Sequence, residues 1–240
     1  MCGRYTLTSS GEELAAHFEL QASLELRPRF NVAPTQAVVV VRRADPQDTP
    51  GKAGDRVLAE HRWGLIPAWA RDEAIGHRTF NARSETAAAK PAFRAAFRAR
   101  RCLVPLTGFY EWRRRGARRE PHWFHPLPES AGLWAAAGLW ERWTGRDGAV
   151  IASCTLLTTR ANAVVSAVHD RMPVLLSPGD YARWLDPESN DPEALTDLLV
   201  PWPAERTAVR AVSERVNDVR AEGPDLLLPA GPAAQGELFE

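Results

Sequence analysis

The sequence predicts an α+β fold in a single domain, built from curved, mainly antiparallel, barrel-like β-sheets with short peripheral helices. Many short apolar or aromatic runs favour strands, and few helical stretches separate them, which argues against an alternating α/β chain. At 240 residues the chain is long enough to form one large domain with an ample core. We place this domain at residues 1–223 and expect a flexible C-terminal tail over residues 224–240.

Local signals place the individual elements. Ser10 followed by Glu13 forms a capping-box pattern that predicts a helix over 11–20. A second helix is expected over 86–99, and Asp/Ser–Pro pairs introduce two short ones over 178–185 and 192–199. The polar, Pro/Gly-rich segment 44–55 is expected to be a loop. Strands are expected over 37–42, 56–65, 101–105, 108–114, 133–142, 149–157 and 172–176.

Composition narrows the class of protein. A hydrophobic fraction of 45% and a charged fraction of 25% are ordinary for a soluble globular chain. No apolar run approaches the roughly 18 residues of a membrane span, and Arg4 and Ser9 interrupt any signal-peptide pattern, so we expect a cytoplasmic protein without a membrane partner. Three cysteines without CxxC spacing indicate a reduced protein with no zinc or other metal site, and Cys102 and Cys154 stand in apolar runs typical of a core.

A formal net charge of zero hides a segregation of charge along the chain. Nine arginines stand between Arg94 and Arg119 against one acid, whereas residues 180–240 hold thirteen acids and five arginines. A basic surface facing a polyanion and an ordinary solvated face both explain the arginine cluster. Nine tryptophans add possible stacking platforms for unpaired bases, although most tryptophans are expected in the core.

Cys2 is the most informative single residue. Aminopeptidases remove Met1 when residue 2 is small, and the product would carry an α-amine and a thiol on adjacent carbons. The pKa of such an amine is about 7.7–8.0 and that of a thiol about 8.5, so both are partly nucleophilic near neutrality. The amine can condense with an aldehyde to a Schiff base, and the thiol can then close a five-membered thiazolidine ring. An incidental cysteine at position 2 is the alternative.

Four segments place a polar or reactive group two residues before an arginine, and residues i and i+2 of an extended chain face the same side. The four pairs are Cys2 and Arg4, Asn81 and Arg83, Glu111 and Arg113, and His169 and Arg171. Glu111 stands in an aromatic run, where burial would raise the pKa of its carboxyl and suit it to proton transfer. A structural ion pair with a nearby arginine would explain the same glutamate.

Several long motifs make the chain resemble the SOS response-associated peptidase (SRAP), or abasic-site processing, family over roughly residues 2–220. They are MCGRY at 1–5, FNVAPTQ at 30–36, RWGLIPAW at 62–69, FNARSET at 80–86, KPAFRAAFRARRCLVPLTGFYEW at 90–112, LTTRAN at 157–162 and HDRMPV at 169–174. The departures are mild, such as Arg113 where lysine is common after GFYEW.

The resemblance implies covalent capture of abasic sites in single-stranded DNA through a thiazolidine link, as part of the DNA damage response. It implies that Cys2 is the nucleophile, exposed by self-catalysed, peptidase-type removal of Met1. Asn81 would position the α-amine, Glu111 would move protons during lyase-like sugar opening and imine formation, and His169 would assist. Backbone phosphates would contact Arg4, Arg83 and Arg171, and Trp69 would stack at the junction of single strand and duplex. No cofactor is implied.

Two other functions remain to be weighed. N-terminal-nucleophile glutamine amidotransferases also begin Met–Cys–Gly, but the downstream motifs fit SRAP proteins, and ammonia release from glutamine would discriminate. A non-covalent single-stranded DNA-binding module with an incidental Cys2 predicts complexes that denaturing gels dissociate.

Overall fold

The computed structural model describes residues 2–21, 23–45, 55–127, 132–189 and 191–230. Its centre is a closed barrel of five strands in the order β10–β4–β3–β6–β9, which closes because β9 also pairs with β10. Within this barrel the β4–β10 pair is parallel and the other four pairs are antiparallel. The strands are β3 (Ala37–Arg43), β4 (Arg56–Trp63), β6 (Arg101–Leu106), β9 (Trp134–Thr144) and β10 (Val150–Arg160).

Three short strands extend the barrel wall. Both β5 (Asn81–Arg83) and β11 (Arg171–Pro173) pair with β10, and β12 (Leu175–Leu176) pairs with β9. The barrel wall carries buried apolar side chains on both of its faces, such as Val40 on one face and Leu103 and Leu139 on the other. Mainly antiparallel, barrel-like sheets are therefore confirmed as the architecture.

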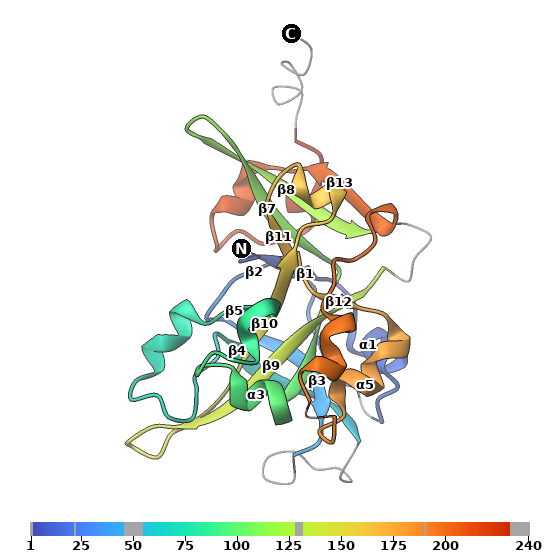
Figure 1. Cartoon of the computed structure of the whole chain (residues 1–240). Helices are drawn as coiled ribbons and strands as arrows, with labels where there is room; N and C mark the ends of the chain where they lie inside the picture. The colour runs from blue at the N-terminus through green and yellow to red at the C-terminus, as the bar shows by residue number, and fades with distance from the viewer. Residues whose placement is uncertain (1, 22, 46–54, 128–131, 190, 231–240) are drawn as a thin grey trace.

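A second sheet lies at the upper end of the barrel in Figure 1, in the order β13–β8–β7–β1–β2 with every neighbouring pair antiparallel. Its strands are β1 (Tyr5–Leu7), β2 (Arg29–Val32), β7 (Gly108–Arg115), β8 (Arg118–Pro126) and β13 (Thr207–Ala211). Gly108 leaves room for the Trp123 side chain against β7, because a Cβ atom there would lie 2.4 Å from the indole nitrogen. This sheet contains Glu111 on β7 and holds Cys2 a few residues before β1.

Short helices surround the sheets, as the sequence predicts (Figure 1). The α-helices are α1 (Gly11–Phe18), α2 (Ser84–Ala87), α3 (Arg94–Ala99), α4 (Ala163–Ser166) and α5 (Tyr181–Leu185). The 3₁₀ helices are η1 (Glu73–Arg78), η2 (Pro178–Asp180), η3 (Glu193–Leu198), η4 (Ala204–Arg206), η5 (Glu214–Asn217) and η6 (Pro224–Leu227). The capping box at Ser10 is present, with both reciprocal hydrogen bonds formed.

The single helix expected over 86–99 is wrong. The segment forms α2 and α3, separated by turns around Pro91, because proline lacks the N–H that a continuous helix needs and clashes with the preceding turn. The expected loop over 44–55 lies mostly outside the described residues. Of the expected tail, residues 224–230 contact the domain, where Leu226 is buried and Ala230 donates to the Ala211 carbonyl; residues 231–240 lie outside the described residues.

Two kinds of feature are absent from the described residues. No helix in this part of the chain is long and apolar enough to cross a membrane. Within the same ranges, no group of three or more His, Cys, Asp or Glu side chains is arranged to hold a metal ion.

Candidate active site

Cys2 lies immediately before β1 and is almost completely buried. Pairing of β1 with β7 holds this segment, and the backbone N–H of Tyr110 donates to the Arg4 carbonyl at 2.9 Å. Burial raises the pKa of the Cys2 thiol well above its usual range, and the nearby Glu111 carboxylate raises it further. The thiol is therefore neutral at physiological pH, so it needs a base before it can act as a nucleophile.

Asn81, the first residue of β5, contacts Cys2 directly. Its Nδ2 donates a hydrogen bond of 2.6 Å to the Cys2 carbonyl oxygen. Parallel pairing of β5 with β10 fixes this position, with Asn81 opposite Leu156. The other side-chain atom, Oδ1, is buried and has no hydrogen-bond partner in the described structure. A buried amide oxygen beside the Cys2 backbone is an acceptor suited to an N–H group of an amine.

Glu111 lies on β7 opposite His122 of β8, and only 3% of it is exposed. Burial raises the pKa of its carboxyl to about 7, so at neutral pH the group is divided between its acid and base forms. A general acid–base catalyst works best with such a pKa. The structure therefore agrees with the expectation that burial raises the pKa of Glu111.

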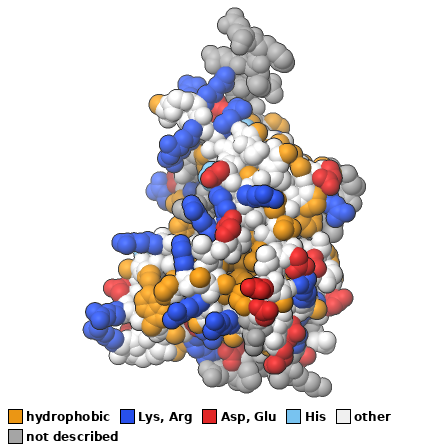
Figure 2. All heavy atoms as spheres, viewed as in Figure 1, with side chains coloured by type: hydrophobic (Ala, Val, Ile, Leu, Met, Phe, Trp, Pro, Cys, Tyr) orange, Lys and Arg blue, Asp and Glu red, His pale blue; other side chains and the backbone are white. Residues whose placement is uncertain are grey.

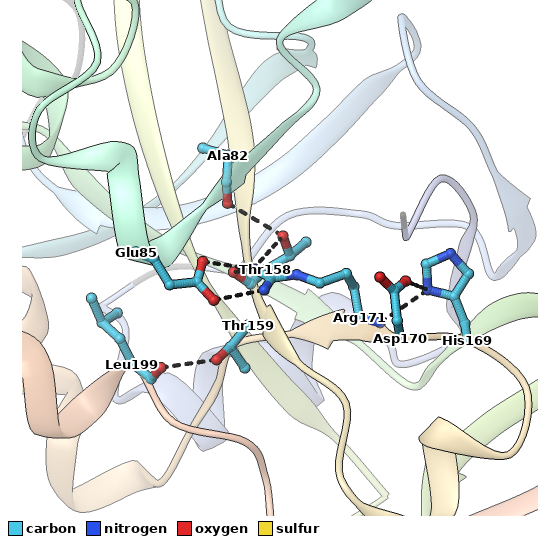
Figure 3. Close-up of polar contacts among 8 residues, drawn as sticks. All are labelled: Ala82, Glu85, Thr158, Thr159, His169, Asp170, Arg171 and Leu199. Atoms are coloured by element: carbon cyan, nitrogen blue, oxygen red, sulfur yellow. Dashed lines mark hydrogen bonds and ion pairs between the residues drawn. The ribbon is translucent and has the colours of Figure 1, made fainter.

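His169 stands between α4 and β11 and faces Glu111, with 3.9 Å between Nε2 and the nearer carboxylate oxygen. The backbone N–H of Arg171 donates to Nδ1 at 3.0 Å, which places the proton of the neutral ring on Nε2, toward Glu111. Asp170 lies 3.1 Å from the same Nδ1 and pairs with it when the ring is protonated (Figure 3). Burial lowers the pKa of His169, which favours the neutral ring. Thus Cys2, Asn81, Glu111 and His169 come together from four separate segments.

Two of the three arginines predicted to contact phosphates already bind protein groups. Arg171 forms a bidentate ion pair with Glu85 at 2.6 and 2.8 Å and also donates to the Thr158 carbonyl (Figure 3). Arg4 donates to the Asn31 side chain and to the Val216 carbonyl, both at 2.7 Å. Both guanidinium groups thus connect segments that are distant in the sequence.

Arg83 and Trp69, the other two predicted DNA contacts, are more exposed than Arg4 and Arg171. Arg83 ends β5, two residues after Asn81, and is exposed. Trp69 is 60% exposed, and its indole N–H donates to the Pro91 carbonyl at 3.3 Å, which fixes the ring at the surface. An exposed, hydrogen-bonded indole offers a flat face for stacking.

Sequence reasoning did not single out Glu85 or Asn31. Glu85 holds Arg171, and the buried Asn31 receives Arg4 while donating to the carbonyls of Asp218 and Ala221. The sequence position of Asn31 could have indicated this role, because an amide inside the short apolar run Phe-Asn-Val needs buried hydrogen-bond partners.

Comparison with known proteins shows the family. The family model described as SOS response associated peptidase (SRAP) matches residues 1–219. The chain belongs to the SRAP family. It is 37% identical over 233 residues to abasic site processing protein YoqW of Bacillus subtilis, covering 95% of this chain and 99% of that protein. It is 32% identical over 229 residues to abasic site processing protein HMCES of Gallus gallus, covering 85% of this chain and 66% of that protein.

Solved structures share the fold. A protein from Bacteroides thetaiotaomicron superposes with a TM-score of 0.82 at 25% identity, covering 95% of this chain and all of that one. A second, from Bordetella bronchiseptica, has a TM-score of 0.73 at 29% identity, covering 88% of this chain and all of that one.

Proposed function

We propose that this protein binds single-stranded DNA and captures abasic sites covalently through Cys2, after Met1 has been removed. The observation that carries the proposal is the contact of Asn81 with Cys2 beside a buried carboxyl. Asn81 Nδ2 holds the Cys2 carbonyl, its Oδ1 remains available as an acceptor, and the pKa of Glu111 is about 7. The names of YoqW and HMCES as abasic site processing proteins support abasic DNA as the substrate.

The chemistry balances without a cofactor. The Cys2 amine attacks the aldehyde carbon of the ring-opened sugar to give a carbinolamine, and protonated Glu111 gives its proton to the departing hydroxyl, which leaves as water. The N–H proton of the carbinolamine returns to the Glu111 carboxylate, which leaves a neutral imine, and the Cys2 sulfur attacks the imine carbon. The thiol proton passes to the nitrogen, and a five-membered thiazolidine closes. One water is released for one C–N and one C–S bond formed.

Asn81 and His169 assist in this scheme. Asn81 Oδ1 accepts a hydrogen bond from an N–H of the amine, which turns the lone pair of the amine nitrogen toward the aldehyde. Neutral His169, with its Nε2 proton facing Glu111, exchanges protons with the carboxyl between steps. Removal of Met1 is a hydrolysis that consumes one water, and we propose that the same groups catalyse it, in keeping with the family's description as a peptidase.

We further propose that Arg83 binds a backbone phosphate and that Trp69 stacks on a base, because both side chains are exposed. Arg4 and Arg171 complete the contact surface. A phosphate that approaches Arg171 must compete with the Glu85 carboxylate, which already satisfies the guanidinium fork.

A denaturing gel tests the proposal. A single-stranded oligonucleotide with one abasic site should give a band that survives denaturant and heat. Intact DNA and a cyclic-ether abasic analogue, which cannot open to an aldehyde, should give none. Cys2→Ala should lose the durable band, whereas the matched Cys154→Ala should keep it. A durable adduct with Cys2→Ala contradicts the thiazolidine scheme, and borohydride should trap only an imine there.

Mass spectrometry supplies the second measurement. The reacting protein should lack Met1, because an amide nitrogen cannot form the imine. Full activity in protein that retains Met1 would rule the proposal out. Dissociation of every complex in denaturant would favour the non-covalent DNA-binding module instead.

A further inference from the structure

The motif LTTRAN at 157–162 carries one charged side chain that the site described above does not use. Two other polar side chains of this motif have partners inside the fold: Thr159 donates to the Leu199 carbonyl at 3.1 Å, and Asn162 caps α4. Arg160, the last residue of β10, is exposed, and its guanidinium has no hydrogen-bond or ion-pair partner among the residues that the structure describes. The packing of the protein therefore does not account for this charge.

The strand register places Arg160 beside the candidate active site. Arg160 lies directly opposite Arg171 in the antiparallel β10–β11 pair, and the Cα atoms of such partners are about 4.5–5.5 Å apart. Arg171 in turn donates its backbone N–H to His169. At about 3.4 Å of axial rise per nucleotide, a DNA strand that reaches His169 passes Arg160 within about three nucleotides.

Arg160 also lines a cleft of about 550 Å³ between β10, α2, α3 and the segment that contains η3. This volume lies in the range of about 300–1,000 Å³ that is typical of small-molecule sites. Leu199, Val200 and Pro201 form an apolar wall, and Val200 is 51% exposed. Figure 2 shows hydrophobic side chains with acidic and basic ones beside them over this part of the surface. The cleft is large enough for a nucleobase and offers it an apolar surface.

Three charged side chains of the described structure line this cleft: Glu85, Arg160 and Glu193. The charge of Glu85 is balanced by Arg171, whose guanidinium reaches Glu85 on the side away from His169 (Figure 3). Glu193 is exposed at the start of η3, and its carboxylate has no partner among the described residues. In this part of the chain the cleft thus presents one unpaired guanidinium on β10 and one unpaired carboxylate on η3.

A nucleotide complements this pair of charges. Its phosphate is an anion that a guanidinium binds well. The exocyclic amino groups of cytosine, adenine and guanine donate hydrogen bonds that a carboxylate accepts. Thymine has no amino group there and presents a carbonyl oxygen, which a carboxylate repels. A base beside Glu193 should therefore be an amino-bearing base and not thymine.

We propose that this cleft holds one nucleotide that flanks the abasic site, with its phosphate on Arg160 and its base between Val200 and Glu193. The nucleotide belongs to the strand named under the proposed function, on which this proposal rests. The cleft would give the protein a base preference near the damage, although the covalent chemistry at Cys2 requires none.

The test is fluorescence anisotropy of the full chain with seven-nucleotide single strands that carry the unreactive cyclic-ether abasic analogue at the centre. The other six positions are thymine, and cytosine replaces them one at a time. Cytosine at one position should bind about 5- to 10-fold more tightly than thymine. Glu193→Gln should lose most of this preference. Arg160→Gln should weaken binding of every strand and reduce the slope of log K against log salt concentration by about 0.7.

The matched controls are Glu25→Gln and Arg27→Gln, which change exposed side chains outside the cleft. They should leave the base preference and the salt slope as in the parent, and none of the four variants should lower the melting temperature. Equal binding of cytosine and thymine at all six positions overturns the base site. An unchanged slope in Arg160→Gln, or an equal loss in Arg27→Gln, overturns the phosphate contact.

A crosslinking gel with reactive abasic DNA separates this proposal from the capture chemistry. A parent that crosslinks but shows no base preference overturns the cleft alone. A parent that shows the base preference and the slope change but never crosslinks supports the cleft and overturns the proposed capture through Cys2.

Discussion

Cys2 and the two barrel cysteines lie in different regions of the molecule, but their thiols have similarly raised pKa values. Cys102 on β6 and Cys154 on β10 lie inside the barrel wall, and all three thiols are free and buried. Burial raises the pKa of each of them. Thiol acidity therefore does not distinguish the candidate nucleophile from two core residues.

The difference lies in the neighbours. Around Cys2 the structure places an amide donor on its carbonyl, a carboxyl with a pKa of about 7 and a histidine 3.9 Å from that carboxyl. All three cysteines belong to the same hydrophobic core cluster, so apolar packing does not distinguish Cys2 from Cys102 and Cys154 either. In the function that we propose, the reactivity of Cys2 therefore depends on the polar groups around the N-terminal segment and not on an activated thiolate.

Among the polar groups around Cys2, Glu111 should show the largest effect when it is substituted. Glu111→Gln keeps the size and removes the proton, so adduct formation should slow by about 10²-fold or more while binding of intact DNA stays unchanged. Single-turnover crosslinking and anisotropy measure the two quantities. Equal losses of rate and affinity would assign Glu111 a structural role.

The pH dependence of the rate of adduct formation tests the role of Glu111 more specifically. In the parent, the amine gains reactivity as pH rises toward its pKa of about 7.7–8.0. Because the raised pKa of Glu111 is about 7, its acid form is present below that pH and is lost above it. The parent should therefore show a bell-shaped rate profile, and Glu111→Gln should lose the alkaline fall. An identical fall in both proteins would assign that limb to another group.

Asn81 should show a smaller effect because it positions Cys2 and does not transfer protons. Asn81→Ala removes the hydrogen bond to the Cys2 carbonyl and the free acceptor, and should slow adduct formation about 10-fold. Asn81→Asp is the matched control: its carboxylate would hold the amine protonated, so its rate optimum should move to higher pH. Parent-like rates in Asn81→Ala would exclude the positioning role.

Much of the barrel follows from local sequence. The strands predicted over 37–42 and 101–105, each built around an apolar run, coincide with β3 and β6 to within one residue. Strands β1, β2, β8 and β13 were not predicted, because three are short and β8 opens with charged residues and contains two prolines. These strands form because they pair with neighbouring strands of the sheet, and local strand propensity does not describe that pairing.

In the candidate site, too, local motifs predict some features, whereas others depend on how the strands pair. Cys2, Asn81, Glu111 and His169 could be predicted from motifs, since each belongs to a distinctive local run. The Arg171–Glu85 pair could not, because it forms only when β5 and β11 pair with opposite edges of β10. Residues 86 positions apart meet through that topology, and no local pattern encodes the contact.

The smallest functional effect should come from the barrel cysteines, which makes them the strictest check on the comparison. Cys154→Ala removes a completely buried sulfur and should lower the free energy of unfolding by about 1–2 kcal/mol. Adduct yield at a temperature well below the transition should equal that of the parent. Chemical denaturation and the abasic-DNA gel measure the two quantities on one preparation. If Cys154→Ala lost the adduct while remaining folded, the polar groups around Cys2 would no longer be enough to identify the nucleophile.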